Sequence, residues 1–78
     1  MIHGIYPFYL RTTTTTEGTG YPTLEGAREA LRRLLTMAQS RGHHTVEQPD
    51  GRWVSHQQPS GSVTIWIEDE AGHTVRLE

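Results

Sequence analysis

Residues 23–42, TLEGAREALRRLLTMAQSRG, carry the most regular hydrophobic pattern in the chain. Placed at about 100° per residue, its apolar side chains fall within one arc of roughly 160° that contains no polar residue. This sorting has the period of a helix and not that of a strand, so the stretch predicts one amphipathic α-helix. The apolar stripe consists of Leu24, Ala27, Ala30, Leu31, Leu34, Leu35, Met37 and Ala38.

The ends and the charged face of this stretch agree with a helix. Thr23 is a suitable N-cap, and Gly42 can take the left-handed conformation that closes a helix. Glu29 can pair with Arg32 and Arg33 at spacings of three and four residues. Because acidic residues are interleaved with the arginines, we interpret the charged face as solvated and not as a phosphate-binding surface.

Composition limits the classes of protein to which the chain can belong. Its 78 residues predict a single domain, residues 1–78, and a net charge of −2 argues against nucleic-acid binding by bulk electrostatics. All basic residues are arginine, which we attribute to codon usage in a GC-rich bacterium or phage. Without cysteine, a long apolar run or a basic secretory leader, the chain is expected in the cytoplasm, away from membranes.

The residues before the helix predict one strand. The segment 6–11, YPFYLR, is aromatic and is followed by five β-branched threonines, and Pro7 belongs at a strand start or edge. The run Thr12–Thr16 is either the end of that strand or an extended surface segment. Residues 17–22 read as a loop, whose GTG element lacks the spacing and the lysine of a phosphate-binding P-loop.

Two hairpins are expected after the helix. Residues 43–48 and 62–69 read as strands, and the turns 49–51 and 70–72 each suit a three-residue loop closed by glycine. A second break, with Pro59 and Gly61, falls at 57–61. The predicted pairs are Gln48 with Arg52, Glu47 with Trp53, Val46 with Val54, Ile67 with Val75, Ile65 with Leu77, Trp66 with Arg76 and Glu68 with Thr74.

These elements predict an α+β fold. One amphipathic helix packs on one face of a mostly antiparallel sheet, in the order β-α-β-β-β-β. The apolar strand residues expected to face the helix are Val46, Val54, Val63, Ile65, Ile67, Val75 and Leu77.

Residues with metal-binding or catalytic chemistry form no familiar pattern. His44 and His56 are predicted cross-strand neighbours, but a zinc site needs about three protein ligands and no such cluster is evident. None of the serines lies in a nucleophile-elbow motif. We therefore expect no bound metal, no cofactor and no catalytic residues. An enzyme would need a pocket that joins His44, His56 and a carboxylate.

The most informative feature is the sheet face that the helix leaves uncovered. The predicted register places Trp53, Trp66 and Arg76 on this face, with Thr64 and Glu68 around them. Tryptophan and arginine are typical of interaction hot spots, so these five residues are the predicted protein-binding site. Two alternatives stay open: the Thr-rich segment can fold over the face, or a register slip of one residue turns Trp53 inward.

The sequence therefore favours a non-catalytic binding protein that docks on a partner protein or on a second copy of itself. A small phage or mobile-element inhibitor of a host protein complex is one instance, and an accessory subunit is another. The alternative is binding of single-stranded nucleic acid, with Trp53 and Trp66 stacking on bases.

Overall fold

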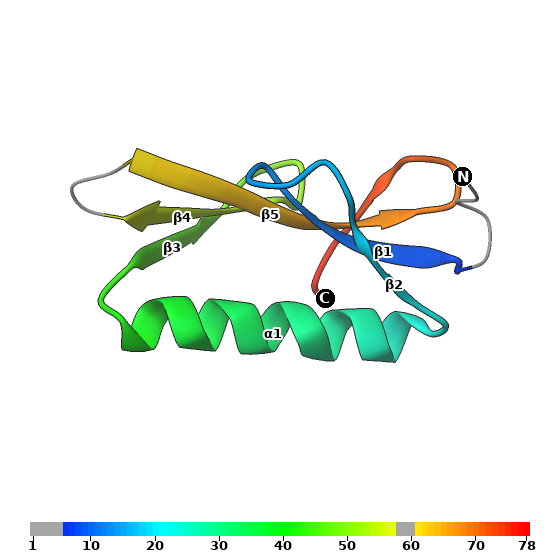
Figure 1. The fold of residues 1–78 in the computed structure, drawn as a ribbon, viewed down its shortest axis with the longest axis horizontal. Coiled ribbons are helices and arrows are strands. Elements are labelled where there is room, and N and C mark those ends of the chain that lie inside the picture. Colours follow the sequence, from blue (N-terminus) through cyan, green and yellow to red (C-terminus); the bar gives the residue numbers. More distant parts are fainter. Residues whose placement is uncertain (1–5, 58–60) are drawn as a thin grey trace.

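The computed structural model describes residues 6–57 and 61–78, which form one helix lying along one face of a twisted sheet (Figure 1). This confirms the predicted α+β class. The turn predicted at 57–61 lies largely outside the described residues. The elements are β1 (Phe8–Thr12), β2 (Thr19–Tyr21), α1 (Leu24–Ser40), β3 (His44–Glu47), β4 (Trp53–Gln57), β5 (Gly61–Asp69) and β6 (Thr74–Val75).

The long strand β5 organises the sheet. The strand order is β2-β1-β5-β4-β3, and β6 also pairs with β5. Every pairing among the described strands is antiparallel. The predicted β-α-β-β-β-β order is confirmed, with one addition: β2 forms within the segment expected to be a loop and pairs with β1. Thr12 belongs to β1, and Thr13 extends the pairing because its N–H donates to the carbonyl of Thr64.

The helix begins and ends as its sequence predicts. The Oγ1 of Thr23 accepts a hydrogen bond from the N–H of Gly26 at 3.0 Å, which satisfies one of the free donors of the first turn. Gly42 has a φ of 85°, the left-handed conformation expected after the last turn. Glu29 lies 3.7 Å from both Arg32 and Arg33, so the charged face carries its own ion pairs.

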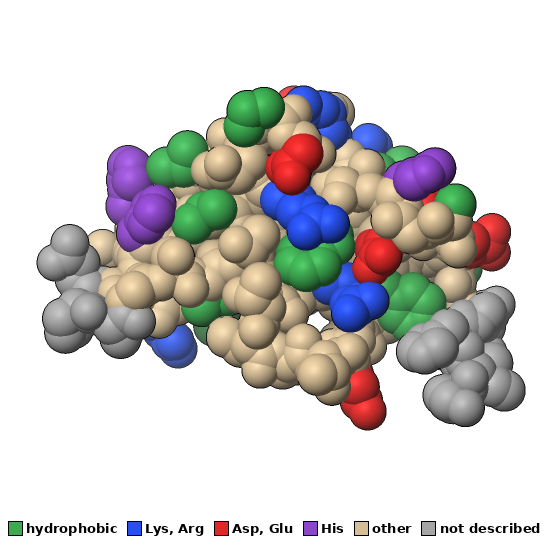
Figure 2. All heavy atoms as spheres, turned by 90° about the horizontal axis from the view of Figure 1, so that it is seen from above, with side chains coloured by type: hydrophobic (Ala, Val, Ile, Leu, Met, Phe, Trp, Pro, Cys, Tyr) green, Lys and Arg blue, Asp and Glu red, His purple; other side chains and the backbone are tan. Residues whose placement is uncertain are grey.

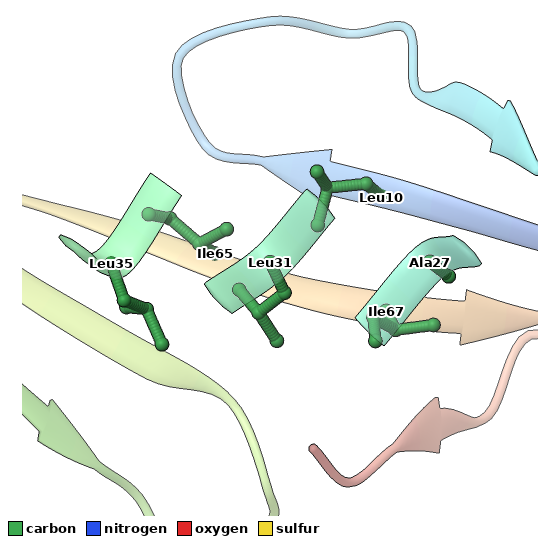
Figure 3. Close-up of a cluster of buried hydrophobic side chains, with 6 residues drawn as sticks. All are labelled: Leu10, Ala27, Leu31, Leu35, Ile65 and Ile67. Carbon is green, nitrogen blue, oxygen red and sulfur yellow. The ribbon is translucent and has the colours of Figure 1, made fainter. Parts of the chain in front are cut away.

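The buried core lies between α1 and the strands β1 and β5 (Figure 3). Leu31 and Ile67 have no exposed surface, and Leu10 stands directly opposite Ile67 on the neighbouring strand. The buried apolar residues are Leu10, Ala27, Leu31, Leu35, Ile65 and Ile67. Half-buried apolar residues pack around them: Phe8, Tyr21, Ala30, Leu34, Trp53, Val63, Val75 and Leu77.

The hairpin registers are confirmed, but the face given to the first hairpin is wrong. Glu47 pairs with Trp53 and Val46 with Val54, as predicted. However, β4 joins β5 with Trp53 opposite Ile65, so Trp53 faces the helix while Val46 and Val54 face away from it. Since side chains alternate along a strand, a shift of one residue turns over the whole hairpin. The observed register places the large apolar surface of Trp53 against the core.

The last hairpin is shorter than predicted. Ile67 pairs with Val75 and Glu68 with Thr74, which confirms the first two pairs. Strand β6 ends at Val75, before the two further predicted pairs, which were Ile65 with Leu77 and Trp66 with Arg76.

Candidate functional site

The face of the sheet turned away from α1 is called the outer face here. Figure 2 views the molecule from this side and shows a hydrophobic side chain near the centre with basic and acidic side chains close by. Histidine side chains lie together at the left end, and a further histidine lies toward the right. The strand registers assign to the outer face Tyr9, Arg11, His44, Val46, Val54, His56, Ser62, Thr64, Trp66, Glu68 and Thr74.

Trp66 lies at the centre of the outer face between two arginines. Arg11 stands opposite it on β1, with its guanidinium carbon 6.0 Å from the centroid of the indole ring. The guanidinium carbon of Arg52 lies 4.2 Å from the same centroid. Both distances fall within the range of cation–π attraction. The indole N–H of Trp66 is buried and finds no acceptor among the described residues, so the ring is held by stacking and packing.

Both arginines are fixed by a second contact. The Nη1 of Arg11 lies 3.0 Å from Oε1 of Glu68, in an ion pair whose side chains are partly buried. The Nε of Arg52 donates to Oγ1 of Thr74 at 3.1 Å. Trp66 and the two arginines therefore form an ordered set on the outer face.

A hollow of about 330 Å³ lies beside the Arg11–Glu68 ion pair. The rings of Tyr6 and Tyr9 help to line it and meet edge to face, with centroids 6.3 Å apart. The carboxylate of Asp69, also in the lining, accepts the N–H groups of two residues in the β5–β6 turn. Of the acidic groups in the lining, Glu68 is thus engaged in the ion pair with Arg11, and Asp69 stabilises the turn.

The other end of the outer face is apolar and imidazole-rich. Val46 and Val54 stand opposite one another, and Val46 is exposed. His44 and His56 form the next such pair, with ring centroids 6.2 Å apart and ring planes 25° from parallel. Their predicted cross-strand placement is therefore confirmed. Among the described residues there is no group of three or more histidine, aspartate or glutamate side chains placed to hold a metal ion.

The structure brings together three of the five predicted site residues. Trp66, Thr64 and Glu68 share the outer face because they alternate along β5. Trp53 packs against the core instead, so its predicted exposure on that face is wrong.

Arg76 also lies apart from Trp66. Its guanidinium donates to Oε2 of Glu47 at 3.1 Å and to the carbonyl of Pro49, across the β3–β4 turn. Its side chain passes over Gly51, where a built Cβ would come within 2.9 Å of the Arg76 Cγ. These contacts hold Arg76 over the turn rather than beside Trp66.

Sequence reasoning missed Arg11 and Arg52, the two cations that flank Trp66. Arg52 could have been found from the alternative in which a register slip of one residue turns Trp53 inward. If Trp53 turns inward, the residues on either side of it, Arg52 and Val54, must turn outward. Predicting Arg11 beside Trp66 would have required the pairing of β1 with β5. These strands are far apart in the sequence, so no turn specifies their pairing.

No protein-family model matches the chain, and neither a curated protein nor a solved structure does. Across residues 6–57 and 61–78, no helix is both long enough and apolar enough to span a membrane.

Proposed function

We propose that this chain is a non-catalytic module that docks on a partner protein through the outer face of its sheet. The observation that carries the proposal is the stack of Trp66 between Arg52 and Arg11, on the face that α1 does not cover. A small inhibitor of a protein complex, encoded by a phage or mobile element, is one form of this function. An accessory subunit is another.

The composition and the order of this face suit protein recognition. Tryptophan and arginine are enriched among the residues that dominate binding energy, and the exposed Val46 adds apolar surface. Glu68 and Thr74 already hold the two arginines in place. A partner therefore has less side-chain freedom to remove on binding, which favours affinity.

Single-stranded nucleic acid is the less favoured ligand. A base can stack on Trp66 only if the ring face is accessible, and the Arg52 guanidinium lies 4.2 Å from the ring centroid. Glu68 sits beside the stack and neutralises Arg11. With a net charge of −2, the chain also lacks the excess of cations that drives phosphate binding.

An enzymatic site is supported less still. The catalytic hypothesis needs His44 and His56 beside a carboxylate, and no acidic residue joins them in a group of three within the described part of the chain. Ser55 has a buried hydroxyl that faces the helix side of the sheet, opposite Val63. A nucleophile needs an adjacent base and access to substrate, and neither is evident at Ser55.

The test compares proteins captured from the source organism's lysate by the intact chain and by matched charge-reversal variants. Arg52→Glu changes the outer face, whereas Arg33→Glu changes the exposed face of α1, where the Arg33 side chain is 76% accessible. A partner should be lost with Arg52→Glu, by at least about tenfold in affinity, and retained with Arg33→Glu.

Val46→Glu provides a second probe of the outer face that leaves the Trp66 stack intact. Retention of the same partner by both outer-face variants would exclude docking through this face. Sedimentation of the purified chain distinguishes a heterologous partner from a second copy. Salt-sensitive binding of a labelled single-stranded oligonucleotide, lost in Arg52→Glu, would instead support the nucleic-acid alternative.

A further inference from the structure

His44 and His56 form an isolated imidazole pair at one end of the outer face. They are direct partners across β3 and β4, and both side chains are exposed. Their rings stack with centroids 6.2 Å apart. Neither ring forms a hydrogen bond or an ion pair with another residue that the structure describes, so their nitrogen lone pairs are not used by the fold.

The described strand neighbours of the pair on the outer face are uncharged. Val46 and Val54 flank it along the two strands, and Ser62 stands opposite His56 on β5. Toward the start of β4 the next charged side chain is Arg52, which precedes the strand and lies four residues from His56, or about 13 Å at the rise of a strand. A divalent cation approaching the two imidazoles therefore meets no adjacent arginine on this strand.

We propose that His44 and His56 form a two-nitrogen site for a divalent transition-metal ion such as Ni²⁺ or Cu²⁺, ions that the imidazole nitrogen suits. Two protein ligands fall short of the three that a zinc site needs. Because both side chains are exposed, rotation about their own bonds can turn the two nitrogens toward one ion without moving the core. The remaining coordination positions belong to water, so the site is open and exchangeable.

Metal binding at this site stabilises the β3–β4 hairpin. The two ligands come from different strands, so both bind the same ion only when the strands are paired. A ligand that binds the folded chain and not the unfolded chain raises stability in proportion to its affinity. Strand β3 is the strand that gains most, because β4 is its one neighbour among the strands that the structure describes.

The test is a titration of the full chain, freed of metal with a chelator, with NiCl2. Thermal unfolding and amide NMR spectra follow binding. The wild-type chain should show a rising melting temperature and line broadening centred on residues 44–46 and 54–56. His44→Gln and His56→Gln should each bind Ni²⁺ at least tenfold more weakly, because one imidazole cannot chelate.

The chain supplies its own controls. His73 is exposed in the β5–β6 turn, and His43 lies just before β3, where it is half-buried and its backbone N–H donates to the carbonyl of Ala38. His73→Gln and His43→Gln should bind Ni²⁺ as the wild type does. Binding should weaken on acidification, since a ligating imidazole must be unprotonated.

Equal affinity of His44→Gln and the wild-type chain would overturn the proposal. So would an equal loss in His73→Gln, because it would show that scattered single histidines bind the ion. Unfolding in the presence of chelator verifies that each exposed substitution leaves the fold intact.

Discussion

Trp53 and Trp66 are the same kind of side chain on neighbouring strands, and they lie on opposite faces of the sheet. Trp53 contributes apolar area to the core. Trp66 is half-buried on the outer face, and arginine guanidinium groups lie over its ring. Their different environments follow from their positions relative to Ile65. Trp53 pairs with Ile65 across β4 and β5, so the two side chains share a face. Trp66 follows Ile65 along β5, so its side chain points to the other face.

Gly51 is a residue at which backbone conformation and packing act together. Its φ is 94°, and a Cβ there would meet the Arg76 side chain at 2.9 Å. Gly51→Ala should therefore lower the free energy of unfolding by about 2 to 3 kcal/mol, which urea denaturation can measure. Gly42→Ala is the matched control, since Gly42 has a φ of 85° but open space around it, and should cost about 1 kcal/mol. If both variants lost the same free energy of unfolding, the Arg76 side chain would have moved away from the new methyl group without destabilising the fold.

At the scale of elements, local sequence determines each unit and its turn. The helix follows from its apolar period and its cap, and the turns at 49–51 and 70–72 close with left-handed Gly51 and Gly72. The N–H of Arg52 also donates to Oδ1 of Asp50, so the first turn carries its own stabilising contact. Each hairpin register follows from its turn, which explains why these registers were predictable.

Thr23→Ala tests the helix as an element. Loss of the hydroxyl leaves the Gly26 N–H without its acceptor, and the free energy of unfolding should fall by about 1 kcal/mol. Thr36→Ala, at an exposed position inside the same helix, should be neutral or slightly stabilising because alanine has the higher helix propensity. Both values come from chemical denaturation. A loss in Thr36→Ala as large as in Thr23→Ala would contradict the capping role.

At the scale of the whole molecule, stability depends on one small core between α1 and the sheet. In a chain of this size, burial only modestly exceeds the entropy lost on folding, so each buried side chain has a large share of the net stability. Leu31 and Ile67 are the largest fully buried apolar side chains. Among the described residues, none on the outer face belongs to the buried cluster.

Leu31→Ala should cost about 3 to 5 kcal/mol, because it removes a fully buried side chain from a core with little capacity to relax. Much of the stability of so small a domain would then be lost, and a substantial unfolded population is expected by circular dichroism. Met37→Ala is the control on the same helix. Met37 is 49% exposed and should cost less than about 1 kcal/mol. A similar loss of unfolding free energy in both variants would contradict the central position of Leu31 in the core.

The helix, its cap, the two three-residue turns and the strand pairs next to each turn could be predicted from the sequence, because all of these depend on residues close together in the chain. Which face of β4 meets the helix could not be predicted from local sequence. That choice depends on the β4–β5 register, and with a side-chain period of two, one step exchanges Trp53 for Val54. Because of this register, Trp53 does not lie beside Trp66 as predicted, and the side chains beside Trp66 are those of Arg52 and Arg11. Burial of Trp53 against Ile65 is the physical reason that this register prevails.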